Sequence, residues 1–291
     1  MSEWVLGVIG GSGLYGLEGL ERVSKQSVET PWGDPSGDLV HAEFHGVKLV
    51  FLPRHGEGHR IPPSQINYRA NIDALKRAGV TDILSLSACG SLKEALAPGA
   101  FVAVDQFIDR TFAREKSFFG TGCVAHVSMA DPVCRRLSGL AADAAEAAGV
   151  ETVQRGGTYL TMEGPQFSTR AESQLYRTWG CDVIGMTNMP EAKLAREAEL
   201  SYASLAMVTD YDCWRSPDAD VDIADILKVM HANTAKAHAV VRHLAQRLAG
   251  EPRTLSPQGI ERSLDTAILT APEHRDPALI AKLGAVAGRV L

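Results

Sequence analysis

The chain contains 291 residues, of which 45% are hydrophobic and 22% charged, and its formal net charge is −6. This composition is typical of a globular protein and excludes a chain that is disordered throughout. A mildly acidic chain lacks the positive charge that binds a nucleic-acid backbone, so we expect no nucleic-acid partner. No apolar run is long enough to span a bilayer, and the N-terminus lacks the basic region typical of a signal peptide. We therefore expect a soluble cytoplasmic protein with no membrane partner.

Apolar runs alternate with segments of helical periodicity along most of the chain. We predict strands at residues 4–9, 47–52, 83–87, 101–104, 158–162, 182–186 and 202–208. We predict helices at residues 64–78, with Ser64 as the N-cap, at 131–148, beginning at Asp131-Pro132, and at 169–179, 190–199 and 222–248. Strands that are apolar on both faces and are separated by helices predict an α/β sheet covered on both sides.

Five cysteines are spread along the chain, and none of them forms a C-x-x-C pair. This spacing is not typical of a zinc knuckle or a thioredoxin-type redox pair. We expect most of the cysteines to be small buried side chains in a reducing compartment.

The C-terminal part of the sequence differs in character from the rest. Gly250–Gly259 is polar, contains two prolines and is typical of a linker. Residues 260–291 carry a weak helical pattern, which leaves open whether this tail docks as an extra helix or stays mobile. We therefore predict one domain, residues 1–250, and a C-terminal extension, residues 251–291, that is partly helical or mobile.

The first predicted strand is followed by a glycine-rich loop, in which Gly11–Gly16 matches the dinucleotide pattern G-x-G-x-x-G. A Rossmann loop opens directly into a helix, and an acidic residue follows about 20 residues later. Here Gly19 interrupts the next segment and Glu29 lies in a turn-like stretch, so an NAD-dependent dehydrogenase is a remote alternative. The loop is otherwise a tight turn, or an anion nest in which backbone N–H groups and the Ser12 hydroxyl hold one phosphate.

A second candidate anion site follows the strand predicted at 47–52. Arg54 offers a planar guanidinium suited to bidentate contact with phosphate. His55 and His59 are potential metal ligands, but the glycines between them disfavour a helical pair and no third ligand is evident, so we expect no metal. Taken alone, the segment is equally consistent with a solvated basic loop.

Eight motifs together resemble the purine nucleoside phosphorylase family, and within it the methylthioadenosine phosphorylases. They cover about residues 5–245 and occur in the family's order: GGSG (10–13), RHGEGH (54–59), NYRANI (67–72), ACGS (88–91), DQFIDRT (105–111), MEGPQFSTRAES (162–173), GMTNMPEAKLAREAEL (185–200) and MVTDYDCW (207–214). The resemblance implies a single α/β domain with a central mixed, mostly parallel sheet flanked by helices. It also implies a homotrimer whose active sites are completed at subunit interfaces.

The resemblance implies a pentosyl transfer. Inorganic phosphate attacks C1′ of 5′-methylthioadenosine, and adenine and 5-methylthioribose 1-phosphate are released through a transition state with oxocarbenium-ion character. We expect this phosphorolysis, which belongs to purine and methionine salvage, to use phosphate as co-substrate and no other cofactor. The implied phosphate-binding positions are Ser12, Arg54, His55, Ser87, the Ala88 backbone N–H and Thr187.

The resemblance also implies how the nucleoside is held. Met186 matches the apolar floor under the ribose, and Phe167 lines the purine face. The implied 5′-methylthio positions are His59, Ile223, Ile226 and Leu227, with His126 supplied by an adjacent subunit. The spacing of the three apolar residues is also simply that of the core face of an amphipathic helix.

Asp210 and Asp212 are the candidate catalytic acids. In an extended segment, two residues so spaced point to the same face; the alternative is a turn or helix-capping pair. Burial raises the pKa of a carboxyl group, which suits Asp210 to proton donation or sharing at N7 of the leaving adenine. Asp212 belongs to the same network, toward N7 and the exocyclic N6 amine.

Two positions favour adenine over a 6-oxopurine. The related 6-oxopurine enzymes have Asn at the first aspartate and Glu after the Phe of GP-x-F, whereas this chain has Asp210 and Ser168. Each mismatched buried polar group costs about 1–3 kcal/mol, or roughly one to two decades in rate. A phosphorylase for 5′-methylthioinosine or other 6-oxopurine nucleosides is the closest alternative, and a non-catalytic nucleoside-binding module is a third.

Overall fold

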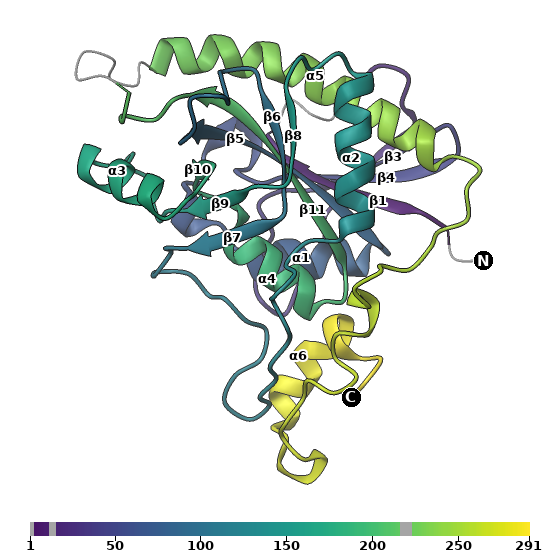
Figure 1. The fold of residues 1–291 in the computed structure, drawn as a ribbon. Helices are drawn as coiled ribbons and strands as arrows, with labels where there is room; N and C mark the ends of the chain where they lie inside the picture. Colours follow the sequence, from purple (N-terminus) through teal and green to yellow (C-terminus); the bar gives the residue numbers. More distant parts are fainter. Residues whose placement is uncertain (1–2, 12–15, 216–222) are drawn as a thin grey trace.

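The computed structural model describes residues 3–11, 16–215 and 223–291, with the backbone alone for residues 223–226. In these residues, helices cover both faces of one mixed β-sheet (Figure 1). The strands are β1 (Val5–Gly10), β2 (Glu21–Gln26), β3 (Leu39–Phe44), β4 (Val47–Pro53), β5 (Asp82–Ser91), β6 (Phe101–Val104), β7 (Gln106–Asp109), β8 (Val153–Arg155), β9 (Thr158–Thr161), β10 (Val183–Gly185) and β11 (Ser201–Asp210). The α-helices are α1 (Tyr68–Arg77), α2 (Arg135–Ala147), α3 (Arg170–Thr178), α4 (Asn188–Glu197), α5 (Ile223–Leu248) and α6 (Pro277–Ala287).

Strand β5 is the branch point of the sheet. It pairs in parallel with β11 along one edge and, over residues 82–85, with β1 on the other. At Gly90 and Ser91 the second edge pairs instead with β10, in antiparallel orientation. Residues 86–89 of β5 therefore lie between the β1 and β10 pairings, and this interruption places them at the cavity described below. Most strand pairs are parallel, as predicted.

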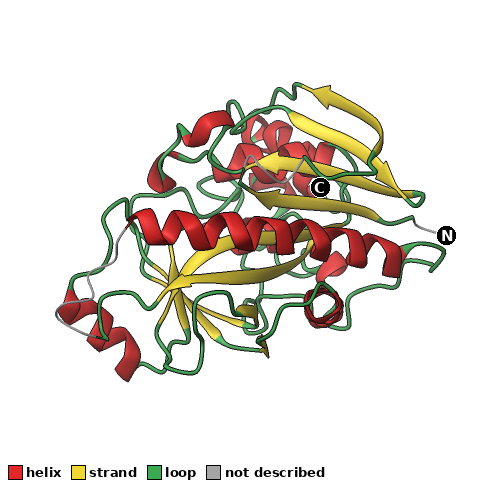
Figure 2. Cartoon of the chain, turned by 90° about the horizontal axis from the view of Figure 1, so that it is seen from above, coloured by secondary structure: helices red, strands yellow, loops and turns green. Residues whose placement is uncertain are grey.

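The two faces of the sheet are covered by different helices (Figures 1 and 2). On one face, α2 and α5 pack on the sheet through buried side chains such as Leu137 and Val241. On the other, α1, α4 and α6 share a second core that includes Leu75 and Leu194. The central strands lie between these two cores, because their apolar side chains pack on both faces of the sheet.

The predicted strands all occur, with ends shifted by a few residues, but two helices begin later than predicted. The first begins at Tyr68, because the Ser64 hydroxyl donates to Glu163 and the Asn67 side chain accepts the capping hydrogen bond from the Ala70 N–H. The second begins at Arg135 rather than Asp131, because the Cys134 N–H is bonded to a carbonyl of β11. The strands β2, β3, β7 and β8 were not predicted.

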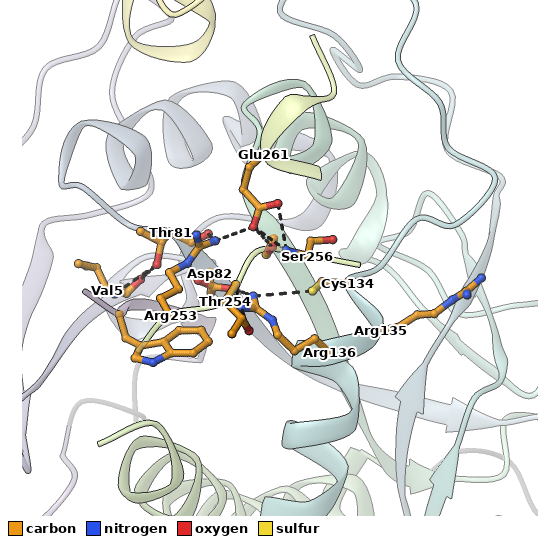
Figure 3. Close-up of polar contacts among 12 residues, drawn as sticks. Val5, Thr81, Asp82, Cys134, Arg135, Arg136, Arg253, Thr254, Ser256 and Glu261 are labelled. Carbon is orange, nitrogen blue, oxygen red and sulfur yellow. Dashed lines mark hydrogen bonds and ion pairs between the residues drawn. The ribbon is translucent and has the colours of Figure 1, made fainter. Parts of the chain in front are cut away.

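The C-terminal tail is docked, and the segment predicted as a linker is part of the docking site (Figure 3). Arg253 forms ion pairs with Asp82, at the start of β5, and with Glu261. Farther along, α6 buries Leu283 and Val286 against the core that contains α1. Of the two alternatives left open by the sequence, the structure has the docked helix.

The described residues include no helix that is long and apolar enough to cross a membrane. All five cysteines are free thiols, and four of them are buried, as predicted; Cys213 is partly exposed.

Candidate active site

A cavity of about 610 Å³ lies at the carboxyl ends of β1, β4, β5, β10 and β11. Ligands of open α/β sheets bind at the carboxyl ends of the strands, because the loops that follow the strands converge there. Ten of the predicted site residues line the cavity: Arg54, His55, His59, Ser87, Ala88, Phe167, Met186, Thr187, Asp210 and Asp212. The structure therefore brings together residues that are up to 158 positions apart (212 − 54) in the sequence.

Some predicted residues do not line this cavity. Ser168 lies just behind the wall, where its hydroxyl contacts the sulfur of Met162 at 3.4 Å. Leu227 is 45% exposed, and His126 is exposed on a segment bonded to the C-terminal tail. Ser12 lies outside the described residues, as do the side chains of Ile223 and Ile226.

The two aspartates enter the cavity from a turn, not from one extended segment. β11 ends at Asp210, and Asp212 has a left-handed backbone with φ of 52°. The Asp212 N–H donates to Oδ1 of Asp210 at 2.7 Å, so the turn alternative describes the backbone correctly. Gly90 makes room for this arrangement, because a Cβ there would lie 3.0 Å from Oδ1 of Asp210.

Burial raises the pKa of both carboxyl groups above the ordinary range of aspartate. For Asp210, hydrogen bonds from the Thr209 hydroxyl and the Asp212 N–H act in the opposite direction. For Asp212, the Ser173 side chain acts against the effect of burial, and the negative charge of Asp210 adds to it. Its Oδ2 is buried, and no group among the described residues forms a hydrogen bond of normal geometry with it. The pair therefore places two carboxyl groups that are more readily protonated than an ordinary aspartate at one end of the cavity.

At the opposite end, Arg54 forms its bidentate contact with a protein carboxylate. Its Nε and Nη2 lie 2.8 and 3.1 Å from the two oxygens of Glu191, and both side chains are buried. Nη2 also donates to the Ser85 hydroxyl, and Nη1 donates to the Leu86 carbonyl oxygen. The pair of donors predicted to bind phosphate is thus bound to Glu191, and the predicted bidentate contact is wrong. Only the second Nη1 hydrogen of Arg54 is left to bind a ligand in the cavity.

His55 is a neutral side chain at this end of the cavity. Burial, with the adjacent charge of Arg54, lowers the pKa of His55 to about 4. Nδ1 lies 2.9 Å from the carbonyl oxygen of Ile61, which accepts only, so Nδ1 carries the ring proton. Nε2 is therefore a hydrogen-bond acceptor. The ring stacks on His59 with centroids 4.2 Å apart.

A hydrogen-bonded chain of side chains fixes Ser87. Its hydroxyl donates to Oδ1 of Asn188 at 3.1 Å. The Asn188 amide donates to the hydroxyls of Tyr202 and Ser204, and the Tyr202 hydroxyl donates to Glu191 at 2.9 Å. The same carboxylate therefore orients both Arg54 and, through this chain, Ser87.

The remaining wall is mainly apolar. Met186 and Phe167 both line it, and Phe167 is 53% exposed. Helix α5 contributes Met230, Thr234 and Ala237. These three residues, spaced at i, i+4 and i+7 on the predicted helix, were not identified from the sequence; their spacing was the available signal, but it is also that of a core face.

No group of three or more His, Cys, Asp or Glu side chains that could hold a metal ion occurs in residues 3–11, 16–215 and 223–291.

The family model for the phosphorylase superfamily matches residues 5–246. The chain belongs to this superfamily. The matched range contains the whole cavity lining.

The full-length relatives define the family more narrowly. The chain is 62% identical over 287 residues to S-methyl-5′-thioadenosine phosphorylase of Cereibacter sphaeroides, covering 99% of this chain and 98% of the relative. It is 61% identical to the protein of the same name from Bradyrhizobium diazoefficiens, covering 100% and 99%. Within the superfamily, the chain is a member of the S-methyl-5′-thioadenosine phosphorylase family.

Solved structures agree with this placement. A methylthioadenosine phosphorylase from an antarctic soil metagenomic library superposes with a TM-score of 0.90 at 44% identity, covering 98% of this chain and 99% of that one. A Schistosoma mansoni adenosine/methylthioadenosine phosphorylase mutant, in complex with methylthioadenosine, gives 0.81 at 39% identity, covering 90% and 96%.

Proposed function

We propose that this protein catalyses the phosphorolysis of 5′-methylthioadenosine to adenine and 5-methylthioribose 1-phosphate. One observation carries the proposal. A single cavity has buried carboxyl groups, Asp210 and Asp212, at one end, next to Gly90 of β5, and the remaining N–H donor of Arg54 at the other, next to Leu86. A reaction that expels a purine from one side of a sugar while phosphate attacks the other requires this separation of acid and anion site.

Each end has a defined task in this reaction. Asp210 protonates or shares a proton with N7 as the glycosidic bond breaks, so that the leaving adenine does not carry a full negative charge. Its raised pKa leaves more of the group protonated near neutral pH. The Asp212 carboxylate, which lines the same end of the cavity, accepts a hydrogen bond from the N6 amine. Ser168 behind Phe167 leaves no carboxylate to bind N1–H of a 6-oxopurine.

The residues at the phosphate end contribute by positioning phosphate for attack on C1′. Arg54, Ser87, the Ala88 N–H and Thr187 hold phosphate below C1′, together with Ser12, which lies outside the described residues. Nε2 of His55 accepts a hydrogen bond from the hydroxyl group that monohydrogen phosphate carries at neutral pH. The negative charge of phosphate then stabilises the positive charge that develops on the sugar.

We further propose a cytoplasmic homotrimer that needs no metal or organic cofactor. In a trimer, His126 of one subunit would approach the 5′ end of a neighbouring cavity. Ile223, Ile226 and Leu227 are proposed to contact the methylthio group there. This is consistent with the exposure of His126 away from the cavity of its own chain.

The decisive experiment measures adenine release from methylthioadenosine with and without inorganic phosphate. Release that requires phosphate and persists in EDTA supports the proposal. Release that is unaffected by omitting phosphate would assign a hydrolytic nucleosidase instead, and a higher kcat/KM for methylthioinosine would assign the 6-oxopurine alternative.

A further inference from the structure

A second buried Arg–Glu ion pair stands behind the wall of the cavity. Nε of Arg114 lies 2.9 Å from Oε1 of Glu163, and the two side chains are 1% and 10% exposed. Neither residue lines the cavity. A buried ion pair adds little net stability compared with well-packed apolar side chains, because desolvation offsets the attraction between the charges. Its position therefore calls for another explanation.

The guanidinium of Arg114 binds main-chain carbonyls on two separate segments. Nη1 donates to the oxygens of Met186 and Met189 at 2.6 and 2.7 Å. Nη2 donates to the main-chain oxygen of Glu163 at 2.6 Å and to that of Met162 at 3.4 Å. Met162 and Met186 both line the cavity, so one side chain fixes the main chain at two parts of its wall.

The carboxylate of Glu163 fixes two further segments. It accepts hydrogen bonds from the Ser64 hydroxyl at 2.5 Å and from the main-chain N–H groups of Phe112 and Ala113 at 2.6 and 3.1 Å. Burial alone would raise the pKa of Glu163, but these bonds and the one from Arg114 lower it to about 2. The carboxylate is therefore ionised at every pH at which the enzyme would be assayed.

Tyr68 completes the connection to the third part of the wall. Its hydroxyl accepts from Nη1 of Arg114 and donates to the carbonyl oxygen of Pro63, both at 3.0 Å. Pro63 lines the cavity next to His59 and Arg60. The pair and Tyr68 thus join the segments 62–64, 112–114, 162–163 and 186–189.

We propose that Arg114 and Glu163 are positioning residues, which set the spacing of the nucleoside-binding wall by fixing the main chain of Met162 and Met186. The inference rests on the proposed function, because it assigns this wall to the nucleoside. It predicts that the Arg114–Glu163 pair affects the binding of the nucleoside, and that the Arg54–Glu191 pair affects the binding of phosphate.

The test compares Arg114→Lys, Glu163→Gln and Tyr68→Phe with Glu191→Gln as the matched control. Lysine keeps the charge, but its ammonium cannot serve carbonyls on two segments as the planar guanidinium does. We expect Arg114→Lys and Glu163→Gln to raise the KM for methylthioadenosine about tenfold with the phosphate KM within about twofold, and Tyr68→Phe to shift it about threefold in the same direction. Glu191→Gln is expected to raise the phosphate KM predominantly.

Equal changes in both KM values would overturn the positioning role, as would unchanged kinetics in variants that fold. If Arg114→Lys and Glu163→Gln do not fold, Tyr68→Phe decides by the same criterion. If the wild-type protein shows no phosphate-dependent release of adenine, the proposed function fails separately. Calorimetric titration with methylthioadenosine then decides the positioning role: weaker binding by the variants supports it, and unchanged binding overturns it.

Discussion

The main-chain N–H of Asp212 donates a 2.7 Å hydrogen bond to Oδ1 of Asp210, and the Thr209 hydroxyl donates to Oδ2, also at 2.7 Å. Both oxygens of Asp210 are therefore held in place before a nucleoside binds. The acid is oriented by its own turn, so substitution of its proton-bearing group need not disturb the backbone.

Asp210→Asn is expected to lower kcat on methylthioadenosine at least tenfold, because an amide cannot donate a proton as an acid. Steady-state rates measured across pH provide the check. Because burial raises the pKa of Asp210, the protonated form and the wild-type rate decline as pH rises through that pKa. The variant should lose this limb. A variant with wild-type kcat would remove Asp210 from the catalytic role.

Base specificity is expected to follow Asp210 and Ser168. The wild-type kcat/KM for methylthioadenosine should exceed that for methylthioinosine. The double variant Asp210→Asn/Ser168→Glu should shift the ratio toward methylthioinosine by roughly one to two decades per position. Competing the two nucleosides in one reaction measures the ratio directly, and Ser168→Ala is the control that adds no carboxylate. An unchanged ratio in the double variant would contradict the assignment.

Glu197 is expected to make stability depend on pH. Its carboxylate accepts from the Ser117 hydroxyl and the Phe118 N–H but has no ion-pair partner among the described residues, and burial raises its pKa to about 7. The unfolded group ionises near pH 4.5. Between these values the folded state binds more protons than the unfolded state, so stability falls as pH rises. Glutamine resembles the protonated form.

The measurement is denaturant unfolding of wild type and Glu197→Gln at about pH 5 and about pH 8. Near pH 5 the two should differ little, and near pH 8 the variant should be more stable by about 3 kcal/mol, the free energy that corresponds to a pKa raised from 4.5 to about 7. The same difference between the proteins at both pH values would show that Glu197 is not the responsible group.

Removal of the C-terminal tail is expected to destabilise the whole domain. A chain ending at Gly250 exposes the apolar surface now covered by Leu264, Leu283 and Val286, and it removes Arg253 from the fully buried Asp82. The midpoint of thermal unfolding should fall by at least about 5 °C. Lys48→Ala, which breaks an exposed ion pair with Glu3, is the control and should change little. An unchanged midpoint in the shortened chain would show that the docked tail adds no stability.

The central strands were predictable from sequence because both of their faces are buried, which leaves continuous apolar runs such as VLGVIG in β1. β2 was not, because all six of its residues are exposed at the edge of the sheet and carry no apolar pattern. The misplaced start of α2 has a tertiary cause. Asp131-Pro132 has the local features of a helix start, but the bond from the Cys134 N–H to β11 takes priority over them.

In the candidate site, too, residues with a local sequence pattern were predictable and residues that depend on tertiary contacts were not. Motif residues such as Asp210 and Thr187 were identifiable because the resemblance supplied their neighbours. The ion pairs Arg54–Glu191 and Arg114–Glu163 were not, because each joins residues at least 49 positions apart and has no local pattern. Propensity and periodicity describe neighbours along the chain, and these pairs exist only once the sheet has formed.

The neutral imidazole of His55 has a consequence for the choice of anion. Its Nδ1–H donates a hydrogen bond to the carbonyl oxygen of Ile61, so Nε2 can only accept, and its partner must be a hydrogen-bond donor. At neutral pH monohydrogen phosphate and arsenate carry such a donor, whereas sulfate does not. Because Glu191 also neutralises Arg54, charge attraction at this end of the cavity does not distinguish the two dianions, and the hydrogen bond to Nε2 does. Sulfate, although similar in size and charge, should compete poorly with phosphate, and arsenate should compete well, in an inhibition assay.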